Sequence, residues 1–100
     1  MPIAQLTIVP VGTNTTSLSN TVVEVQKAIR GTGIKHQLTP MSTILEGSLG
    51  EIMAAVKAAH EAGFSANTGR VLTSLTIDDR RDKPTSMEHK VNIVLDKMKK

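Results

Sequence analysis

The sequence predicts an α+β sandwich in which strands and helices follow the order β-α-β-β-α-β, with a third helix at the C-terminus. Polar and apolar residues alternate over Ile3–Val11 and again over Arg70–Asp79, which is the period of a half-buried strand. Between these two segments, apolar residues recur twice at the spacing of an amphipathic helix. The turn Pro40–Ser42 separates two short strand-like runs, Ile34–Thr39 and Thr43–Glu46, and predicts a hairpin.

The first third of the chain contains one predicted strand and one predicted helix. Ile3–Val11 places Ala4, Leu6 and Ile8 on one face, and we expect that face to contact the core. A turn-rich loop, Pro10–Thr16, follows. The next segment is predicted to be helical until Gly31 and Gly33 end it, because its apolar residues recur at helical spacing: Leu18, Val22, Val25 and Ile29.

The second half begins with a helix that carries its own start signal. Ser48 and Glu51 fit a capping box, and Gly63 is a plausible end. After the last strand, Thr85–Glu88 offers a second capping box before a helix predicted over about residues 85–99. Two right-handed βαβ crossovers joined by a hairpin give the split βαβ plan of the ferredoxin-like fold, with two helices on one sheet face. We treat residues 1–100 as one such domain.

Composition narrows the choice of partner. One hundred residues, 39% apolar and 21% charged, fit one soluble globular domain. The formal net charge of +3 is modest, and three of the twelve basic residues lie in the last four positions, where they suit a helix C-terminus. Phe64 is the only aromatic residue, so the stacking platforms of single-strand nucleic-acid sites and of many sugar sites cannot be built. We therefore predict no nucleic-acid partner.

The cysteine content and the absence of long apolar runs indicate where in the cell the protein is expected. The absence of cysteine excludes a disulfide framework, a thiolate metal site and a thiol nucleophile. The sequence has neither a signal-peptide pattern nor a run of about 18 apolar residues. We expect a cytoplasmic protein with no membrane partner.

A four-stranded sheet with helices on one side leaves its other face open. The candidates for that face are mostly short, neutral and polar, and a face meant for bulk water usually carries more charge. This face is either solvated, with threonine present as a strand former, or packed against another subunit; we favour the second and predict an oligomer. The residues are Gln5, Thr7, Val9, Lys35, Gln37, Thr39, Leu72, Ser74 and Thr76.

Glu46 is the most unusual residue of the predicted sheet, because acids are depleted in strands and costly to bury unpaired. It is either a solvated carboxylate near a helix N-terminus or an acceptor for a ligand with two adjacent donors, such as an aminopyrimidine. Thr43, three residues earlier, points to the opposite face. If Leu45 faces the helices, Glu46 points out of the sheet; if Ile44 does, Glu46 points under the helices.

The remaining polar clusters give weaker signals. Ser17 or Ser19 is expected to cap the first helix, whose free amides could also hold an anion or a hydroxyl. Asp78–Asp82 is read as a solvated charged turn whose arginines neutralise its aspartates, so no metal is expected there. The three histidines lack the spacing of a ligand set, and no nucleophile–base or paired-acid arrangement emerges. We predict that the protein is not an enzyme.

Several motifs together resemble those of the small stand-alone thiamine-binding proteins. The likeness covers about residues 3–82. Its most specific element is the pattern Pro-Met-x-Thr-x-x-Glu-Gly over residues 40–47, supported by Asp-Asp-Arg over residues 78–80. The other segments that carry it are Val-Pro-Val-Gly-Thr at 9–13, Ser17-x-Ser19, Leu38-Thr39 and Arg70-Val71.

This resemblance implies a ferredoxin-like fold, a homotetramer built as a dimer of dimers, and binding of thiamine or its hydroxymethylpyrimidine part. It implies no catalytic activity, and we expect no cofactor. Carried over by position, Thr43 and Glu46 would line the site, with Ser17, Ser19 and Met41 as further candidates. The alternative is an oligomeric regulatory or scaffold module that binds a protein partner through its open sheet face.

Overall fold

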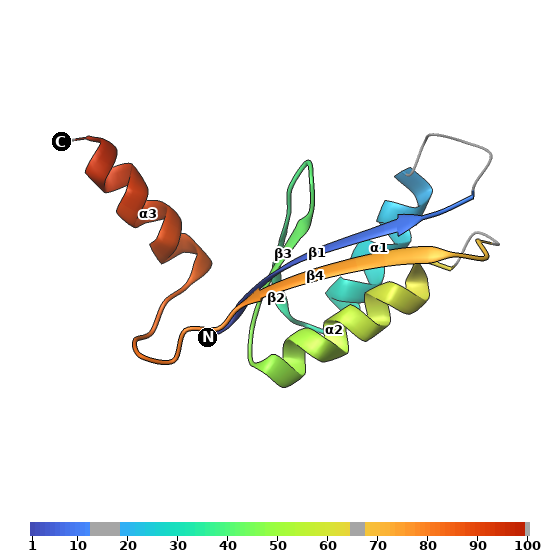
Figure 1. Ribbon diagram of the computed structural model, residues 1–100, viewed down its shortest axis with the longest axis horizontal. Helices are drawn as coiled ribbons and strands as arrows, with labels where there is room; N and C mark the ends of the chain where they lie inside the picture. The colour runs from blue at the N-terminus through green and yellow to red at the C-terminus, as the bar shows by residue number, and fades with distance from the viewer. Residues whose placement is uncertain (13–18, 65–67, 100) are drawn as a thin grey trace.

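The chain folds as the predicted βαββαβ unit with an added helix. The computed structural model describes residues 1–12, 19–64 and 68–99. Figure 1 shows the path of the chain, with α3 extending beyond the end of the sheet. The elements are β1 (Ile3–Pro10), α1 (Ser19–Gly31), β2 (Lys35–Leu38), β3 (Thr43–Glu46), α2 (Leu49–Ala62), β4 (Val71–Asp78) and α3 (Met87–Met98).

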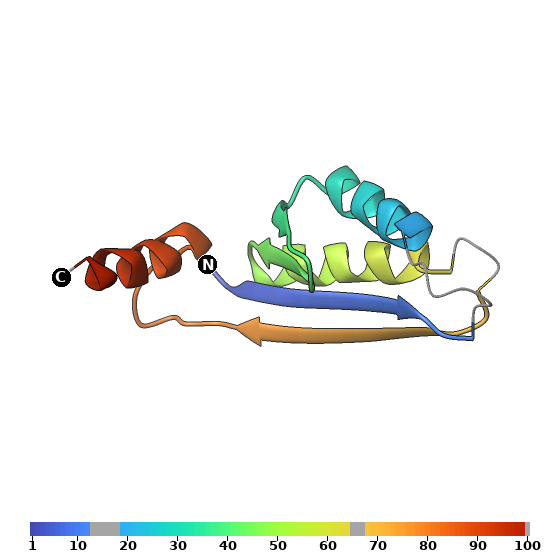
Figure 2. The same cartoon turned by 90° about the horizontal axis from the view of Figure 1, so that it is seen from above.

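The four strands form one antiparallel sheet in the order β2-β3-β1-β4, which is the strand order of the ferredoxin-like fold. Helices α1 and α2 lie on one face of this sheet (Figure 2). β1 pairs with β4 along its whole length, but its pairing with β3 ends at Leu6 and Thr43. Beyond Leu6, the β3 side of β1 therefore has no strand partner among the described residues.

The core lies between the sheet and the two helices. Leu45 of β3 and Ile52 of α2 are fully buried in it. Because Leu45 faces the helices, strand alternation turns Glu46 to the opposite, open face of the sheet. The other buried apolar residues are Ala4, Leu6, Val25, Ile29, Ile34, Ala55 and Ala59.

The sequence predicted the start of α2 correctly and the start of α3 incorrectly. The capping box of α2 is confirmed: Glu51 N donates to Ser48 Oγ at 3.2 Å, and Ser48 N donates to Glu51 Oε1 at 2.9 Å. The box predicted for Thr85–Glu88 is wrong by one position, since Ser86 is the N-cap of α3 and accepts from His89 N at 3.1 Å. Glu88 instead forms an ion pair with Lys35.

None of the helices within the described ranges is long and apolar enough to cross a membrane. Helix α3 is unusual in another respect, because none of its residues is buried. Its apolar side chains are therefore uncovered in the single chain.

Candidate functional site

A cavity of about 340 Å³ opens beside the part of β1 that does not pair with β3. Its walls come from β1, from α1 and from the β2–β3 hairpin. Most of the lining is apolar, with a few hydroxyl and amide groups among the apolar side chains. The lining residues are Leu6, Thr7, Ile8, Val9, Val22, Val25, Gln26, Leu38, Thr39, Pro40, Met41, Ser42 and Thr43.

A hydrogen bond joins α1 to β3 at the wall of this cavity. Gln26 Nε2 of α1 donates to Thr43 Oγ1 of β3 at 2.8 Å. Thr43 is buried, with 5% of its surface exposed. After this bond, the amide group still has a carbonyl acceptor and the threonine still has its hydroxyl proton. The pair can therefore offer one acceptor and one donor to a ligand.

The predicted residues Thr43 and Met41 both line this cavity. Met41 lies at the hairpin turn and is 85% exposed. Thr39 closes that turn: its Oγ1 donates to Ser42 O at 2.8 Å and accepts from Ser42 N at 3.0 Å. Ser17 lies outside the described residues, and Ser19 is the first residue of α1.

Sequence reasoning missed Gln26. Its position offered a signal, because it lies on the same helical face as Val22, Val25 and Ile29, where an apolar residue is expected. A long polar side chain on such a face needs a partner, and here the partner is Thr43 on β3.

Glu46 belongs to a different cluster on the open face of the sheet. It is 8% exposed, and both of its oxygens have partners. Oε1 accepts from Met87 N at 3.0 Å, and Oε2 pairs with Lys35 Nζ at 2.9 Å. Lys35 also pairs with Glu88 Oε1 at 2.5 Å. This arrangement anchors the first turn of α3 to the sheet.

The structure therefore separates residues that the sequence had placed in one site. The prediction that Thr43 and Glu46 point to opposite faces is confirmed. Glu46 does not line the cavity that contains Thr43 and Met41. Its proposed role as a ligand acceptor stays a prediction.

The ion pairs around Lys35 predict how the docking of α3 depends on pH. The hydrogen bonds that Lys35 donates to Glu88 and Glu46 raise the pKa of Lys35 above 10.5, and the bond that Glu88 accepts from Lys35 lowers the pKa of Glu88 below 4.5. The Lys35 contribution is complete below 10.5 and is lost as pH rises through the raised pKa. The Glu88 contribution is present above 4.5 and is lost as pH falls through the lowered pKa.

We expect the NMR chemical shift of the Met87 amide to be constant between these limits and to move toward its undocked value outside them. In Lys35→Met, the change at high pH should disappear. An alkaline change that persists in this variant would contradict the assignment.

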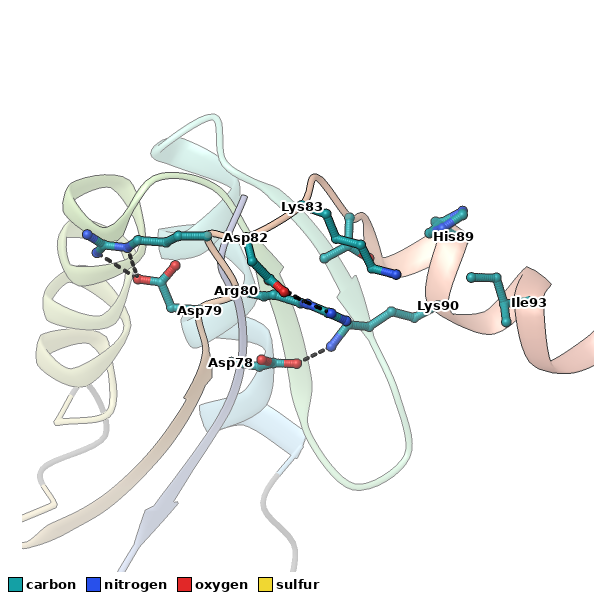
Figure 3. A pocket seen from close by; sticks show the side chains of 10 residues that line it. Asp78, Asp79, Arg80, Asp82, Lys83, His89, Lys90 and Ile93 are labelled. Atoms are coloured by element: carbon teal, nitrogen blue, oxygen red, sulfur yellow. Dashed lines mark hydrogen bonds and ion pairs between the residues drawn. The ribbon is translucent and has the colours of Figure 1, made fainter.

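A second polar region lies between the end of β4 and α3 (Figure 3). Each aspartate of this loop has a basic partner: Arg81 pairs with Asp79 at 2.8 Å, Arg80 pairs with Asp82 at 2.6 Å, and Lys90 pairs with Asp78. These hydrogen bonds lower the pKa of the Asp79 and Asp82 carboxyls. The neutralisation of the aspartates by basic residues agrees with the charged-turn interpretation.

Fold and cavity together define a class, that of small α+β domains with a concave, mostly apolar ligand site that contains a neutral polar pair. The family model described as thiamine-binding protein matches residues 4–95 of the chain. The chain belongs to this family.

Relatives and solved structures agree with this placement. The protein YqgV of Bacillus subtilis is 48% identical over 98 residues, covering 94% of each chain. A protein of Methanothermobacter thermautotrophicus is 44% identical over 96 residues, covering 95% of this chain and 97% of its own. The crystal structure of the MJ1052 protein of Methanocaldococcus jannaschii has a TM-score of 0.85 at 33% identity, covering 93% of this chain and 94% of its own.

A structure from Thermotoga maritima has a TM-score of 0.77 at 25% identity and covers 93% of this chain and 97% of its own. That protein is provisionally described as acting in thiamine biosynthesis or salvage.

Proposed function

We propose that the protein binds thiamine, or its hydroxymethylpyrimidine part, as a homo-oligomer and without catalysing a reaction on it. The name of the family supports the ligand class. The observation that carries the proposal is the hydrogen-bonded pair of Gln26 and Thr43 at the wall of a mostly apolar cavity.

The chemistry of this pair fits an aminopyrimidine edge. Such an edge has an exocyclic amine, which donates, beside a ring nitrogen, which accepts. The Gln26 carbonyl accepts from the amine while the Thr43 hydroxyl donates to the ring nitrogen. Apolar side chains of the lining, Val22 and Leu38 among them, contact the faces of the ring, and the Met41 thioether adds a polarizable contact. The volume of about 340 Å³ lies within the range of small-ligand pockets.

Glu46 does not line the cavity described above, and Glu46, Ser17 and Ser19 each keep a proposed role. A ligand reaches Glu46 only by displacing Met87 or Lys35, or at a boundary with another subunit. Ser17 and Ser19 stay candidates on the strength of the family resemblance. The proposed assembly is a homotetramer built as a dimer of dimers, and the proposed compartment is the cytoplasm.

Calorimetric titration tests the ligand directly. We expect saturable binding of thiamine and of hydroxymethylpyrimidine, because both carry the aminopyrimidine edge. The isolated thiazole part of thiamine, which lacks that edge, is the control and should give no saturable heat. The absence of saturable binding for both pyrimidine ligands would overturn the proposal.

The second candidate is an oligomeric scaffold that binds a protein partner through its open sheet face. The exposed position of Leu72 on that face, with 57% of its surface accessible, favours it. This alternative predicts that no pyrimidine ligand raises the melting temperature. It also predicts that Thr7→Lys or Ser74→Lys, both on the open face, abolishes partner binding.

A further inference from the structure

The cavity beside β1 is lined by uncharged side chains. None of the described residues that line it is acidic or basic. The sequence of its wall segments shows the same property: residues 2–23, which include β1, and residues 37–45, which include the turn of the β2–β3 hairpin, contain no Asp, Glu, Lys, Arg or His. Residues 2–23 are the longest uncharged run of a chain in which 21% of the residues are charged. Charge is therefore missing from the very segments that surround the cavity.

The charged residues that do belong to the wall elements lie elsewhere. On α1, Lys27 Nζ and Glu24 Oε1 pair with each other at 3.6 Å. Arg30 lies in the last turn of α1, C-terminal to every residue of this helix that lines the cavity. On β2, Lys35 pairs with Glu46 on the open face of the sheet. Among the described residues of these elements, no carboxylate is thus placed to neutralise a cation in the cavity.

The start of α1 makes the cavity still less favourable for a cation. Val22, which lines the cavity, lies close to the N-terminus of α1, where the helix dipole places a partial positive charge. The first turn of α1 contains no acidic residue that would offset this charge. An aromatic ring can also stabilise a cation, but the only aromatic residue of the chain, Phe64, is not among the lining residues.

The polar groups that the cavity does offer are all uncharged. Gln26 and Thr43 supply one acceptor and one donor. The edge of β1 beyond Leu6, which does not pair with β3, adds backbone N–H and C=O groups. The remaining lining is mostly apolar. These groups suit a heterocycle that carries hydrogen-bonding atoms but no net charge.

We propose that the cavity discriminates by charge and holds an uncharged aminopyrimidine more tightly than thiamine, whose thiazolium ring carries a fixed positive charge. The pyrimidine of thiamine pairs with Gln26 and Thr43, but its thiazolium stays in water at the mouth of the cavity, beside the exposed Met41. Burial of an ion without a partner is costly, whereas an uncharged second ring packs against the apolar lining. This inference rests on the proposed function and narrows its ligand class to uncharged pyrimidines.

The first experiment compares two ligands of nearly the same shape by calorimetric titration at neutral pH. Deazathiamine keeps the aminopyrimidine of thiamine, but an uncharged thiophene ring replaces the thiazolium. We expect deazathiamine to bind at least about tenfold more tightly than thiamine. Equal affinities, or tighter binding of thiamine, would overturn the inference and leave the proposed function standing. If neither ligand binds, and hydroxymethylpyrimidine does not bind either, the proposed function fails together with the inference.

The second experiment supplies the missing carboxylate. Val22→Asp places one on the cavity wall, and Val23→Asp makes the same change on the neighbouring residue, which does not line the cavity. Both side chains are partly exposed, at 38% and 48%, and an aspartate near a helix N-terminus is favourable, so both variants should fold. Circular dichroism checks this.

The readout is the ratio of the affinity for thiamine to the affinity for deazathiamine. Val22→Asp should shift this ratio toward thiamine by at least about tenfold, and added salt should reduce the shift. Val23→Asp should leave the ratio unchanged. A ratio that Val22→Asp does not alter, or that both variants alter equally, would show that charge at the cavity wall does not determine the choice of ligand.

Discussion

Replacing Gln26 with leucine should weaken thiamine binding about 10- to 100-fold. The change removes the proposed acceptor for the exocyclic amine and also deprives Thr43 of its donor. The amine would then enter the cavity without a partner, and unpaired polar groups in such sites cost about 1–3 kcal/mol. Leucine keeps the apolar contacts of the α1 face, but the buried Thr43 hydroxyl loses its donor, so the free energy of unfolding should fall by about 1–3 kcal/mol.

The matched control is Gln37→Leu on β2. Gln37 is exposed and does not line the cavity, so the same change of side chain should leave the affinity for thiamine unaltered. Thr43→Val should resemble Gln26→Leu, because it removes the proposed donor to the ring nitrogen and is close in shape. If calorimetry finds Gln26→Leu and the unaltered protein equal in affinity, the polar pair does not recognise the ligand.

The local parts of this structure followed from the sequence. Alternation placed Leu6 in the core but left open whether Leu45 or Ile44 faces the helices, and the structure buries Leu45. The spacing of Ser48 and Glu51 predicted the start of α2. Alternation also separated Thr43 from Glu46 correctly, since side chains three residues apart on a strand point to opposite faces. In each case, the interaction or the periodicity lies within a few neighbouring residues, where spacing alone determines geometry.

The parts that could not be predicted depend on contacts between distant segments. Gln26 and Thr43 are 17 positions apart, and Glu46 and Met87 are 41 positions apart. Whether these side chains come into contact depends on how α1 packs on the sheet and on the path of residues 79–86. The N-cap of α3 is Ser86 and not the predicted Thr85. The Glu88 side chain, which the predicted capping box required, forms an ion pair with Lys35 on the distant strand β2.

Glu46 is interpreted either as an anchor of α3 or as a ligand acceptor, and replacing it with alanine tests the anchoring role. In the structure, Glu46 accepts from the first helical amide of α3 and pairs with Lys35. Hydrogen bonds to a charged group are worth about 1.5–3 kcal/mol. We therefore expect the opening equilibrium of the first turn of α3 to rise about 10- to 100-fold, measured as faster hydrogen exchange at Met87 and the following amides.

The variant Glu46→Gln distinguishes an anchor of α3 from a ligand acceptor. Glutamine keeps a carbonyl oxygen for Met87 N but removes the charge that Lys35 pairs with, so exchange should fall between the unaltered protein and Glu46→Ala. Glu61→Ala, which removes an exposed carboxylate on α2, is the control and should leave α3 unaffected. If Glu46 only anchors the helix, thiamine affinity stays the same in Glu46→Gln while α3 loosens. If Glu46 binds the ligand, affinity falls in Glu46→Gln, and bound thiamine speeds exchange at Met87 in the unaltered protein because the two compete for one carboxylate.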